Sequence, residues 1–399
     1  MLPDLPPDAP ALDALALDAL MDRAVALARR GKGRVSPNPV VGCVVVDARG
    51  AVVGEGWHGR YGGPHAEVWA LDAARAGGAD LSHCTVVVTL EPCAHTGKTP
   101  PCADRLIRDG VRRVVVGMRD PFGAVDGRGI ARLRAAGIEV TVGVREAACA
   151  RLAEAFTTHV RTGRPLVTLK VAQTLDGFAA TESGDSRWVT GEAARRRVHE
   201  LRAASDAVLV GTGTARADDP LLTLRHGVTG TQPLRVVLDR RGTLPGGLHL
   251  FTDAHAARTV AVVSAGRLAQ RPAWHAALGA AGGAVLAVDE RGGQIDLGTL
   301  LDRLGAGDGL PPHPDDGAGA PARPVQSLLV EAGPTLAAAV LAADLADRVC
   351  IFIAPALLGA GRPALATAAA ARMADARRWT DVTWEALGDD ALVTMRRSG

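Results

Sequence analysis

The chain has 399 residues, of which 47% are apolar and 22% charged, and its formal net charge is +2. This length suits two ordinary domains, and the composition is that of a folded protein. A net charge of +2 is too weak for the basic surface that nucleic-acid-binding proteins carry. No apolar run reaches membrane-spanning length. The acidic, proline-rich segment 1–10 is unlike a targeting peptide. We therefore expect a cytoplasmic protein with no nucleic-acid or membrane partner and with its six cysteines reduced.

Strands and helices alternate along the first part of the chain. Apolar residues at helical spacing run from Ala11 to Arg30, and we place the boundary between a flexible tail (residues 1–16) and a first domain (residues 17–162) inside that stretch. Further helices are expected at Ala66–Ala76, Ala103–Asp109, Arg128–Ala136 and Arg145–Arg161. Strands are expected at Val40–Val46, Ala51–Gly56, Thr85–Leu90, Arg113–Met118 and Ile138–Val144. This order predicts a layered α/β domain.

The turn residues of Thr162–Pro165 interrupt the pattern, and a second α/β domain is expected over residues 165–399. Its strands are predicted at Leu166–Ala172, Ala207–Gly211, Leu234–Leu238, Thr259–Val263, Ala284–Val288, Gln326–Val330, Arg348–Ala354, Val382–Leu387 and Ala391–Arg396. Its helices are predicted at Glu192–Ala203, Leu297–Leu304 and Thr335–Ala342. The segment Gly305–Pro324 has no periodicity and is rich in glycine and proline, so we expect a surface insertion there.

One histidine and two cysteines in the first domain form a candidate zinc site. His65 stands two residues before Glu67, and Cys93 and Cys102 follow further along the chain. Three protein ligands leave one zinc position open for water, as in catalytic sites, and Glu67 is placed to handle the protons of that water. The alternatives are a disulfide or two buried thiols for the cysteines, and an ordinary loop position for the histidine.

The arrangement H-x-E…P-C…C resembles the zinc-dependent nucleobase deaminases, in which zinc activates water for attack on a ring carbon and glutamate shuttles protons. In the general signature two residues separate the cysteines, whereas here eight do, Ala94–Pro101. This longer form, Thr89–Cys102, closely resembles the diaminohydroxyphosphoribosylaminopyrimidine deaminases of riboflavin biosynthesis. The only lysines of the chain are Lys32, Lys98 and Lys170, and Lys98 lies in the insert, where an ammonium group suits the substrate's phosphate.

Two glycine-containing loops of the second domain follow strands. Gly333-Pro334-Thr335 comes after Gln326–Val330, and its free N–H groups can bind a phosphate. Gly211–Ala215 comes after a strand too, but it lacks the third glycine of the dinucleotide fingerprint. Either loop alone is as consistent with a simple turn as with a cofactor site.

Taken in order, four stretches of the second half resemble the reductase that is fused behind this deaminase in riboflavin biosynthesis. They are Leu169–Gly177, Gly184–Thr190, Gly213–Pro220 and Val330–Leu336. The resemblance runs over nearly the whole chain from about Leu20. It implies a cytidine-deaminase-like three-layer domain followed by a dihydrofolate-reductase-like α/β domain, with one zinc ion and NADPH as cofactors.

The resemblance also implies roles for individual residues. Zinc would be held by His65, Cys93 and Cys102, with Glu67 as the catalytic residue. NADPH would contact Ala172, Trp188, Thr214, Asp218, Gly333, Pro334, Thr335, Leu336, Ala337, Ala338 and Ala339. Substrate would contact Ser186, Arg202, Leu222, Arg225 and Glu331. Further candidates come from the residues themselves and not from the resemblance: Asn38 and His58 for the pyrimidine, Lys98 for the phosphate, Lys170 near the site of hydride transfer, and Arg240 for the adenosine 2′-phosphate, at a position where this chain departs from the family. From the sequence alone, Arg202 fits a solvated helix face and Arg225 a charge at a strand end.

The expected activity is therefore bifunctional. The first domain would remove the 2-amino group of 2,5-diamino-6-(5-phosphoribosylamino)pyrimidin-4-one. The second would reduce the ribosyl side chain with NADPH, giving 5-amino-6-(5-phosphoribitylamino)uracil. The partner is this small phosphoribosylated pyrimidine, and a homo-oligomer is expected. Two other interpretations stay open: a purine, cytosine or tRNA deaminase with an unrelated second domain, and a zinc-stabilised binding protein whose catalytic sites have decayed.

Overall fold

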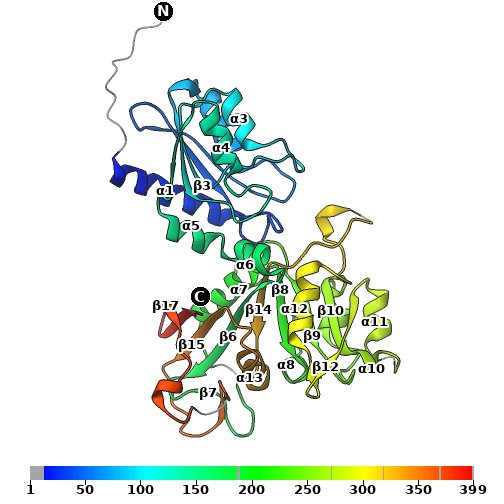
Figure 1. Ribbon diagram of the computed structural model, residues 1–399. Coiled ribbons are helices and arrows are strands. Elements are labelled where there is room, and N and C mark those ends of the chain that lie inside the picture. Colours follow the sequence, from blue (N-terminus) through cyan, green and yellow to red (C-terminus); the bar gives the residue numbers. More distant parts are fainter. Residues whose placement is uncertain (1–12, 187–188, 271, 318, 368–369, 398–399) are drawn as a thin grey trace, which may run out of the picture. The chain divides into compact units, whose positions relative to one another are not determined.

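The computed structural model describes residues 13–186, 189–270, 272–317, 319–367 and 370–397. The chain divides into two compact units, Met1–Thr162 and Gly163–Gly399 (Figure 1). No helix in the described ranges combines the length and the apolar character that crossing a membrane requires.

The first unit is built on a five-stranded sheet of order β2-β1-β3-β4-β5, in which β1 pairs antiparallel with both neighbours and β3, β4 and β5 run parallel. Its strands are β1 (Gly42–Val46), β2 (Val52–Trp57), β3 (Thr85–Leu90), β4 (Arg113–Met118) and β5 (Glu139–Val142). Its helices are α1 (Ala14–Ala28), α2 (Ala66–Ala76), α3 (Cys102–Arg108), α4 (Arg128–Ala135), α5 (Glu146–Leu152) and α6 (Glu154–Thr162).

Two hydrophobic clusters make this unit a three-layer sandwich. One cluster packs α2, α3 and α4 against one face of the sheet, and the other packs α1 and α5 against the opposite face. The central strands β1, β3 and β4 are buried on both faces, which is why they read as continuous valine-rich runs in the sequence. Figure 1 shows α1 and α5 together on one side of β3.

Helix α2 lies unusually close to strand β2. An added Cβ on Gly56 would stand 2.3 Å from the Ala66 carbonyl oxygen, and one on Gly54 would stand 2.2 Å from that of Ala70. Two glycines in β2 therefore let the helix backbone rest directly on the strand. Because α2 begins immediately after His65, this contact fixes where the first turn of the helix lies.

The second unit contains a nine-stranded sheet of order β11-β10-β9-β8-β14-β6-β15-β18-β17. Its strands from β11 to β15 run parallel, and β18 and β17 are antiparallel. The strands of this sheet are β6 (Leu166–Thr174), β8 (Ala207–Gly211), β9 (Leu234–Leu238), β10 (Thr259–Ser264), β11 (Ala284–Val288), β14 (Ser327–Glu331), β15 (Arg348–Ala354), β17 (Thr380–Leu387) and β18 (Asp390–Arg396). Four short strands form two further pairs, β12 (Glu290–Arg291) with β13 (Gln294–Ile295) and β7 (Phe178–Ala180) with β16 (Arg362–Pro363).

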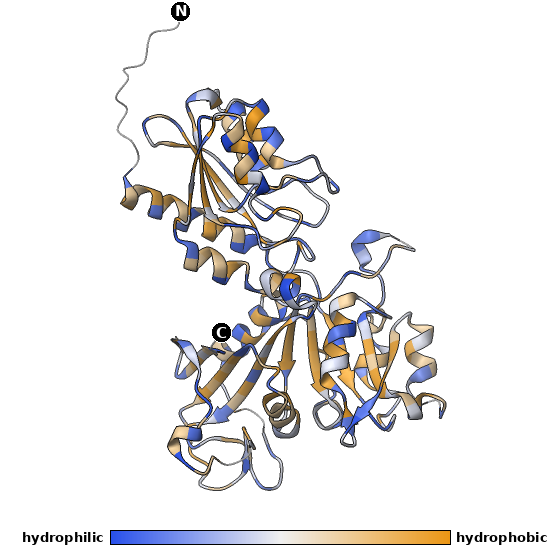
Figure 2. Ribbon diagram, viewed as in Figure 1, coloured by the Kyte–Doolittle hydropathy of each residue, from blue (hydrophilic) through white to orange (hydrophobic). Residues whose placement is uncertain are grey.

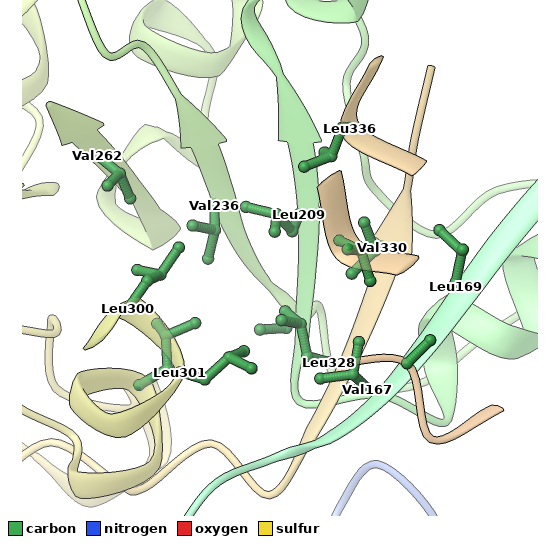
Figure 3. Packing of buried hydrophobic residues seen from close by; sticks show 14 of the residues in the cluster. Val167, Leu169, Leu209, Val236, Val262, Leu300, Leu301, Leu328, Val330 and Leu336 are labelled. Carbon is green, nitrogen blue, oxygen red and sulfur yellow. The ribbon is translucent and has the colours of Figure 1, made fainter. Parts of the chain in front are cut away.

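Helices cover both faces of the large sheet. They are α7 (Glu192–Ala203), α8 (Thr212–Asp218), α9 (His249–Thr252), α10 (Ala265–Leu268), α11 (His275–Ala280), α12 (Leu297–Ala306) and α13 (Pro334–Ala342). Leucines of α12 and α13 pack on one face against side chains of β6, β8, β9, β10 and β14 (Figure 3). Helices α8, α9 and α11 contribute to a cluster on the other face. The buried strands are mostly hydrophobic, whereas the helices contain both hydrophobic and hydrophilic residues (Figure 2).

The structure differs from the sequence-based expectation in several segments. The helix predicted over Arg145–Arg161 is two helices, α5 and α6, because α5 buries Cys149 and Leu152 in the core whereas α6 has no buried residue. The segment after β8, taken as a loop, forms helix α8. Helix α1, capped by Asp13, begins at Ala14 inside the range assigned to the tail, and residues 1–12 lie outside the described ranges.

We expect the substitution Gly56→Ala to destabilise the first unit by roughly 1–3 kcal/mol, the usual cost of overpacking, and to weaken zinc binding. The new methyl group would displace the backbone of α2 at Ala66 and Ala70. Urea unfolding and a zinc titration measure the two effects. Gly59→Ala is the matched control, because the nearest atom to its added Cβ is 3.7 Å away. Equal behaviour of the two variants would contradict the close approach.

Candidate active sites of the two units

Three segments of the first unit bring its metal-ligand candidates together. His65 is the residue before α2, Cys102 is the first residue of α3, and Cys93 follows the end of β3. The ligand atoms of the three residues all lie within 4.8 Å of one another. The Cys102 backbone N–H donates to Cys93 Sγ over 3.2 Å, which joins the two cysteine segments.

The imidazole of His65 has a defined orientation in this cluster. Its Nδ1 lies 3.6 Å from Cys93 Sγ and 3.3 Å from Cys102 Sγ, and its Nε2 lies 3.3 Å from the Thr99 hydroxyl. With Nδ1 facing the metal position, Nε2 carries the proton and donates to Thr99. One imidazole and two sulfurs are the soft donors that zinc prefers, so the residues present fit this ion.

Each of the two thiols affects the proton affinity of the other. The Cys102 thiol donates a hydrogen bond to Cys93, which lowers the pKa of the Cys93 thiol to about 4, and His65 adds to this effect. This thiol–thiol bond, together with burial, raises the pKa of Cys102 well above its usual range. At neutral pH the cluster therefore already contains one thiolate, the form that binds metal.

Glu67 lies in the first turn of α2, next to this cluster, and is only 3% exposed. Burial raises the pKa of its carboxyl group, although the neighbouring His65 opposes that effect. Raising the pKa of a carboxyl group makes it better able to accept a proton and later release it.

Two side chains of the insert between the cysteines contact aromatic rings outside it. The Lys98 ammonium stands 4.0 Å from the centre of the Tyr61 ring, and His95 meets Phe122 edge-on at 5.7 Å. Lys98 itself is exposed. The exposed ammonium group of Lys98 therefore lies against Tyr61, in the turn that leads into His65.

Two predicted substrate-binding residues, Asn38 and His58, contact each other. Asn38 Nδ2 lies 3.0 Å from His58 Nε2, and His58 Nδ1 lies 3.0 Å from the Pro64 carbonyl oxygen. His58 is 2% exposed, and its ring packs edge-on against His65 at 5.2 Å. Both ring nitrogens of His58 thus have partners within the protein.

The sequence reasoning missed two buried carboxylates beside the site. Glu91 accepts hydrogen bonds from the backbone N–H groups of Asp120, Gly127 and Ile130, and so holds the segment that enters α4. Burial, with Glu91 nearby, raises the pKa of Asp120 to about 6. Both residues precede a proline, which is the only local signal that they occupy tight turns.

In the second unit the predicted cofactor residues gather where parallel strands end. Gly333 caps α13 after β14, and the Thr214 hydroxyl of α8 lies 3.4 Å from the position of a Cβ on Gly333. Residues Pro334–Ala339 form the first turns of α13, and Asp218 ends α8. The loops after β8 and β14 are therefore adjacent, as in nucleotide-binding α/β folds. Ala172 lies on β6 beside β14, and Trp188 lies outside the described residues.

Arg240 and its neighbour Asp239 follow β9. Asp239 is fully buried and accepts hydrogen bonds from the Thr243 and Leu244 backbone N–H groups and from Trp274 Nε1. Its carboxylate is therefore used within the protein. Arg240 is half-buried and pairs with Glu290 over 3.2 Å.

A buried ion pair occupies the centre of this sheet edge. Arg202 of α7 binds Glu331 at the end of β14 through two parallel hydrogen bonds and also donates to the Thr223 carbonyl oxygen over 3.1 Å. Lys170 is the register partner of Glu331 on β6. Burial opposes ionisation of Glu331, but Arg202 and Lys170 outweigh it and hold the pKa of its carboxyl below the usual range. Burial lowers the pKa of Lys170.

The surface position that the sequence suggested for Arg202 is therefore wrong, because the side chain is buried and paired with Glu331. Arg225 is exposed, and its backbone N–H donates to His199 Nδ1 over 3.0 Å. Burial, with the arginines 202 and 225 and His226, lowers the pKa of His199 to about 4. Leu222 has a positive φ of 52° and a side chain buried in the core, so only its backbone is available to a ligand. Ser186 is exposed.

Comparisons with protein families match both units. Residues 16–118 match the cytidine and deoxycytidylate deaminase zinc-binding region, and residues 165–311 and 320–393 match the RibD C-terminal domain. The fold is accordingly a cytidine-deaminase-like domain followed by a dihydrofolate-reductase-like domain. Together they define the class of bifunctional deaminase–reductases.

Full-length relatives share both domains. The chain is 39% identical over 367 residues to the riboflavin biosynthesis protein RibD of Escherichia coli, covering 87% of this chain and 90% of that protein. It is 36% identical over 384 residues to RibD of Mycobacterium tuberculosis, covering 95% and 97%. The chain belongs to the RibD family.

Solved structures agree over nearly the whole chain. Acinetobacter baumannii RibD superimposes with a TM-score of 0.81 at 35% identity, covering 97% of this chain and 100% of that one. A diaminohydroxyphosphoribosylaminopyrimidine deaminase/5-amino-6-(5-phosphoribosylamino)uracil reductase from Thermotoga maritima gives 0.81 at 36% identity, covering 96% and 99%. The chain is thus a bifunctional enzyme of riboflavin biosynthesis, a zinc-dependent deaminase and an NADPH-dependent reductase.

We expect Glu331→Gln to destabilise the second unit by roughly 3–5 kcal/mol, because it leaves the Arg202 charge buried without its partner. The measurement is the free energy of unfolding in urea. Asp302→Asn is the matched control: it removes the partner of Arg164 in an exposed pair, and such pairs contribute less than about 1 kcal/mol. A similar loss in both variants would contradict the importance of burial.

Proposed function

We propose that residues 17–162 form the deaminase, with a zinc ion held by His65, Cys93 and Cys102. The support is the 4.8 Å cluster of their ligand atoms, and this observation carries the proposal. Zinc with three protein ligands activates a water molecule at its fourth position. Thr99 keeps the His65 ring in the ligating orientation through Nε2.

Glu67 is the catalytic proton carrier of this step. Its carboxyl group lies beside the cluster but is not needed as a ligand, and burial raises its pKa. It takes a proton from the attacking water and delivers it to the leaving ammonia. His65 and the cysteines fix the reacting position, while Glu67 shuttles between its two protonation states.

The substrate is 2,5-diamino-6-(5-phosphoribosylamino)pyrimidin-4-one. The name of the Thermotoga maritima relative describes an activity of this kind. Lys98 is the phosphate-binding residue, because its ammonium group is exposed on the insert that borders the metal site. Asn38 holds the pyrimidine by its side-chain amide.

Residues 165–399 form the reductase, and NADPH would be held at the carboxyl ends of β6, β14, β8 and β9. Within Gly333–Ala339, the first turn of α13 offers the backbone N–H groups of Thr335 and Leu336 to the pyrophosphate. Thr214 and Asp218 of α8 line the same edge, Ala172 contacts the cofactor from β6, and Arg240 binds the adenosine 2′-phosphate in exchange for Glu290. NADPH supplies the hydride for the reduction of the ribosyl group.

The substrate of the reductase binds beside the buried ion pair. Glu331 and Lys170 offer an acceptor and a donor to the sugar hydroxyl groups, and Arg202 keeps Glu331 ionised. Arg225, Ser186 and the Leu222 backbone complete the site, with Arg225 as the exposed cation for the phosphate.

The protein is a cytoplasmic homo-oligomer. Its six cysteines are free, as expected in a reducing compartment. Strand β17 is the exposed edge of the nine-stranded sheet, and Trp384 on it is 72% exposed. An exposed edge strand that presents the apolar side chains of Val382 and Trp384 can pair with a second copy of the chain.

We expect Glu67→Gln to bind zinc normally and to release ammonia roughly 10²–10⁴ times more slowly, the usual contribution of a general acid–base group. Ammonia release is measured with the diaminopyrimidinone substrate in the absence of NADPH. The internal control is NADPH oxidation with the deaminated substrate, which this variant should retain. Unchanged ammonia release would exclude Glu67 as the proton carrier, and NADPH oxidation without deaminated substrate would contradict the order of the two steps.

We expect Trp384→Lys to convert the oligomer to a 41.1 kDa monomer, because it places a charge on the edge strand. Light scattering after gel filtration measures the mass. Trp69→Lys, at a 53% exposed tryptophan of the other unit, should leave the mass unchanged. A monomeric wild-type protein would rule out the homo-oligomer.

A further inference from the structure

Two hydrogen bonds fix the tautomer of His58. The Pro64 carbonyl oxygen, 3.0 Å from Nδ1, can only accept a hydrogen bond, so Nδ1 carries the proton. Asn38 Nδ2, which can only donate, lies 3.0 Å from Nε2, so Nε2 is the nitrogen without a proton and accepts this bond.

This tautomer determines which way the Asn38 amide faces. Asn38 lies 3.0 Å from His58 Nε2 and must present its NH₂ group to this acceptor. Its carbonyl oxygen Oδ1 is therefore directed elsewhere, and no donor among the described residues reaches it. Asn38 also donates its backbone N–H to the Val35 carbonyl oxygen, which holds the residue in its turn.

His58 connects this amide to the metal site. It is 2% exposed, so substrate cannot displace either of its partners without moving the ring. The ring packs edge-on against His65, and its partner Pro64 is the residue before this metal-ligand candidate. The His58 imidazole thus holds Pro64, the residue before His65, and also sets which end of the Asn38 amide faces the ring.

We propose that His58 is a positioning residue that orients the Asn38 amide, so that Oδ1 accepts a hydrogen bond from an N–H group of the aminopyrimidine. This inference rests on the proposed function, in which Asn38 holds the ring, and it replaces direct substrate binding by His58. An amide of this polarity selects a ring edge that carries N–H donors and disfavours one that carries acceptors at the same place.

A double-mutant cycle tests the proposal in the zinc-loaded full-length chain. We expect Asn38→Ala and His58→Phe each to lower kcat/KM for ammonia release by on the order of tenfold, as for one lost hydrogen bond. Phe keeps a ring against His65 but has neither nitrogen. The double variant should be no slower than Asn38→Ala alone, because His58 acts through Asn38. His58→Gln, which offers one donor and one acceptor, should retain most of the activity.

The outcomes separate the two proposals. If the losses multiply in the double variant, His58 does not act through Asn38 and the positioning role is overturned. If Asn38→Ala leaves kcat/KM unchanged, the role of Asn38 in the proposed function fails, and the positioning role fails with it. Zinc content and NADPH oxidation with deaminated substrate identify a variant that has merely lost its fold.

A second measurement needs no disruptive variant. The ¹⁵N chemical shifts of the His58 ring in the wild-type enzyme, assigned by comparison with His58→Gln, report which nitrogen carries the proton. We expect a protonated Nδ1 and an unprotonated Nε2. A protonated Nε2 would oblige Asn38 to present Oδ1 to the ring, and this result would overturn the proposal.

Discussion

The direct contact between helix α2 and strand β2 is the constraint on which the deaminase site depends. Glycines 54 and 56 remove the side chains that would separate the two backbones. The helix start is thereby fixed against the sheet, and His65 and Glu67 belong to that start. The two cysteines come from other elements: Cys93 follows the end of β3, and Cys102 is the first residue of α3. Rigid elements thus place all the groups of the site, which is how precise catalytic geometry is usually obtained.

The reductase uses a different arrangement for the same purpose. Its strands run parallel from β11 to β15, so their carboxyl ends, and the loops that follow them, meet along one edge. Hydrophobic packing of α12 and α13 on one face holds the strands in register beneath that edge. The buried Arg202–Glu331 pair joins α7 to the end of β14 and stiffens the middle of the edge.

Two buried glutamates show how surroundings assign different roles to one side chain. Around Glu67 burial dominates and the pKa of the carboxyl rises, which suits proton transfer. Around Glu331 the effect of burial is outweighed by Arg202 and Lys170, so the pKa falls and the group stays ionised. A carboxylate that remains charged is a dependable hydrogen-bond acceptor. The family relationship gives the two reactions, and the surroundings of each glutamate determine how readily its carboxyl group takes up a proton.

The sequence by itself determined the elements whose signals are local. Continuous apolar runs predicted the buried strands β3, β4 and β8, and the motif predicted that the side chains of His65, Cys93 and Cys102 lie together. Only the tertiary structure decided the pairing of Arg202 with Glu331, 129 residues apart, and the bond between Asn38 and His58. It also decided the break between α5 and α6, which no proline or glycine marks in the sequence. Periodicity and motifs reflect interactions between residues that are close in the sequence. The contacts named above depend instead on which distant strands and helices the fold brings together.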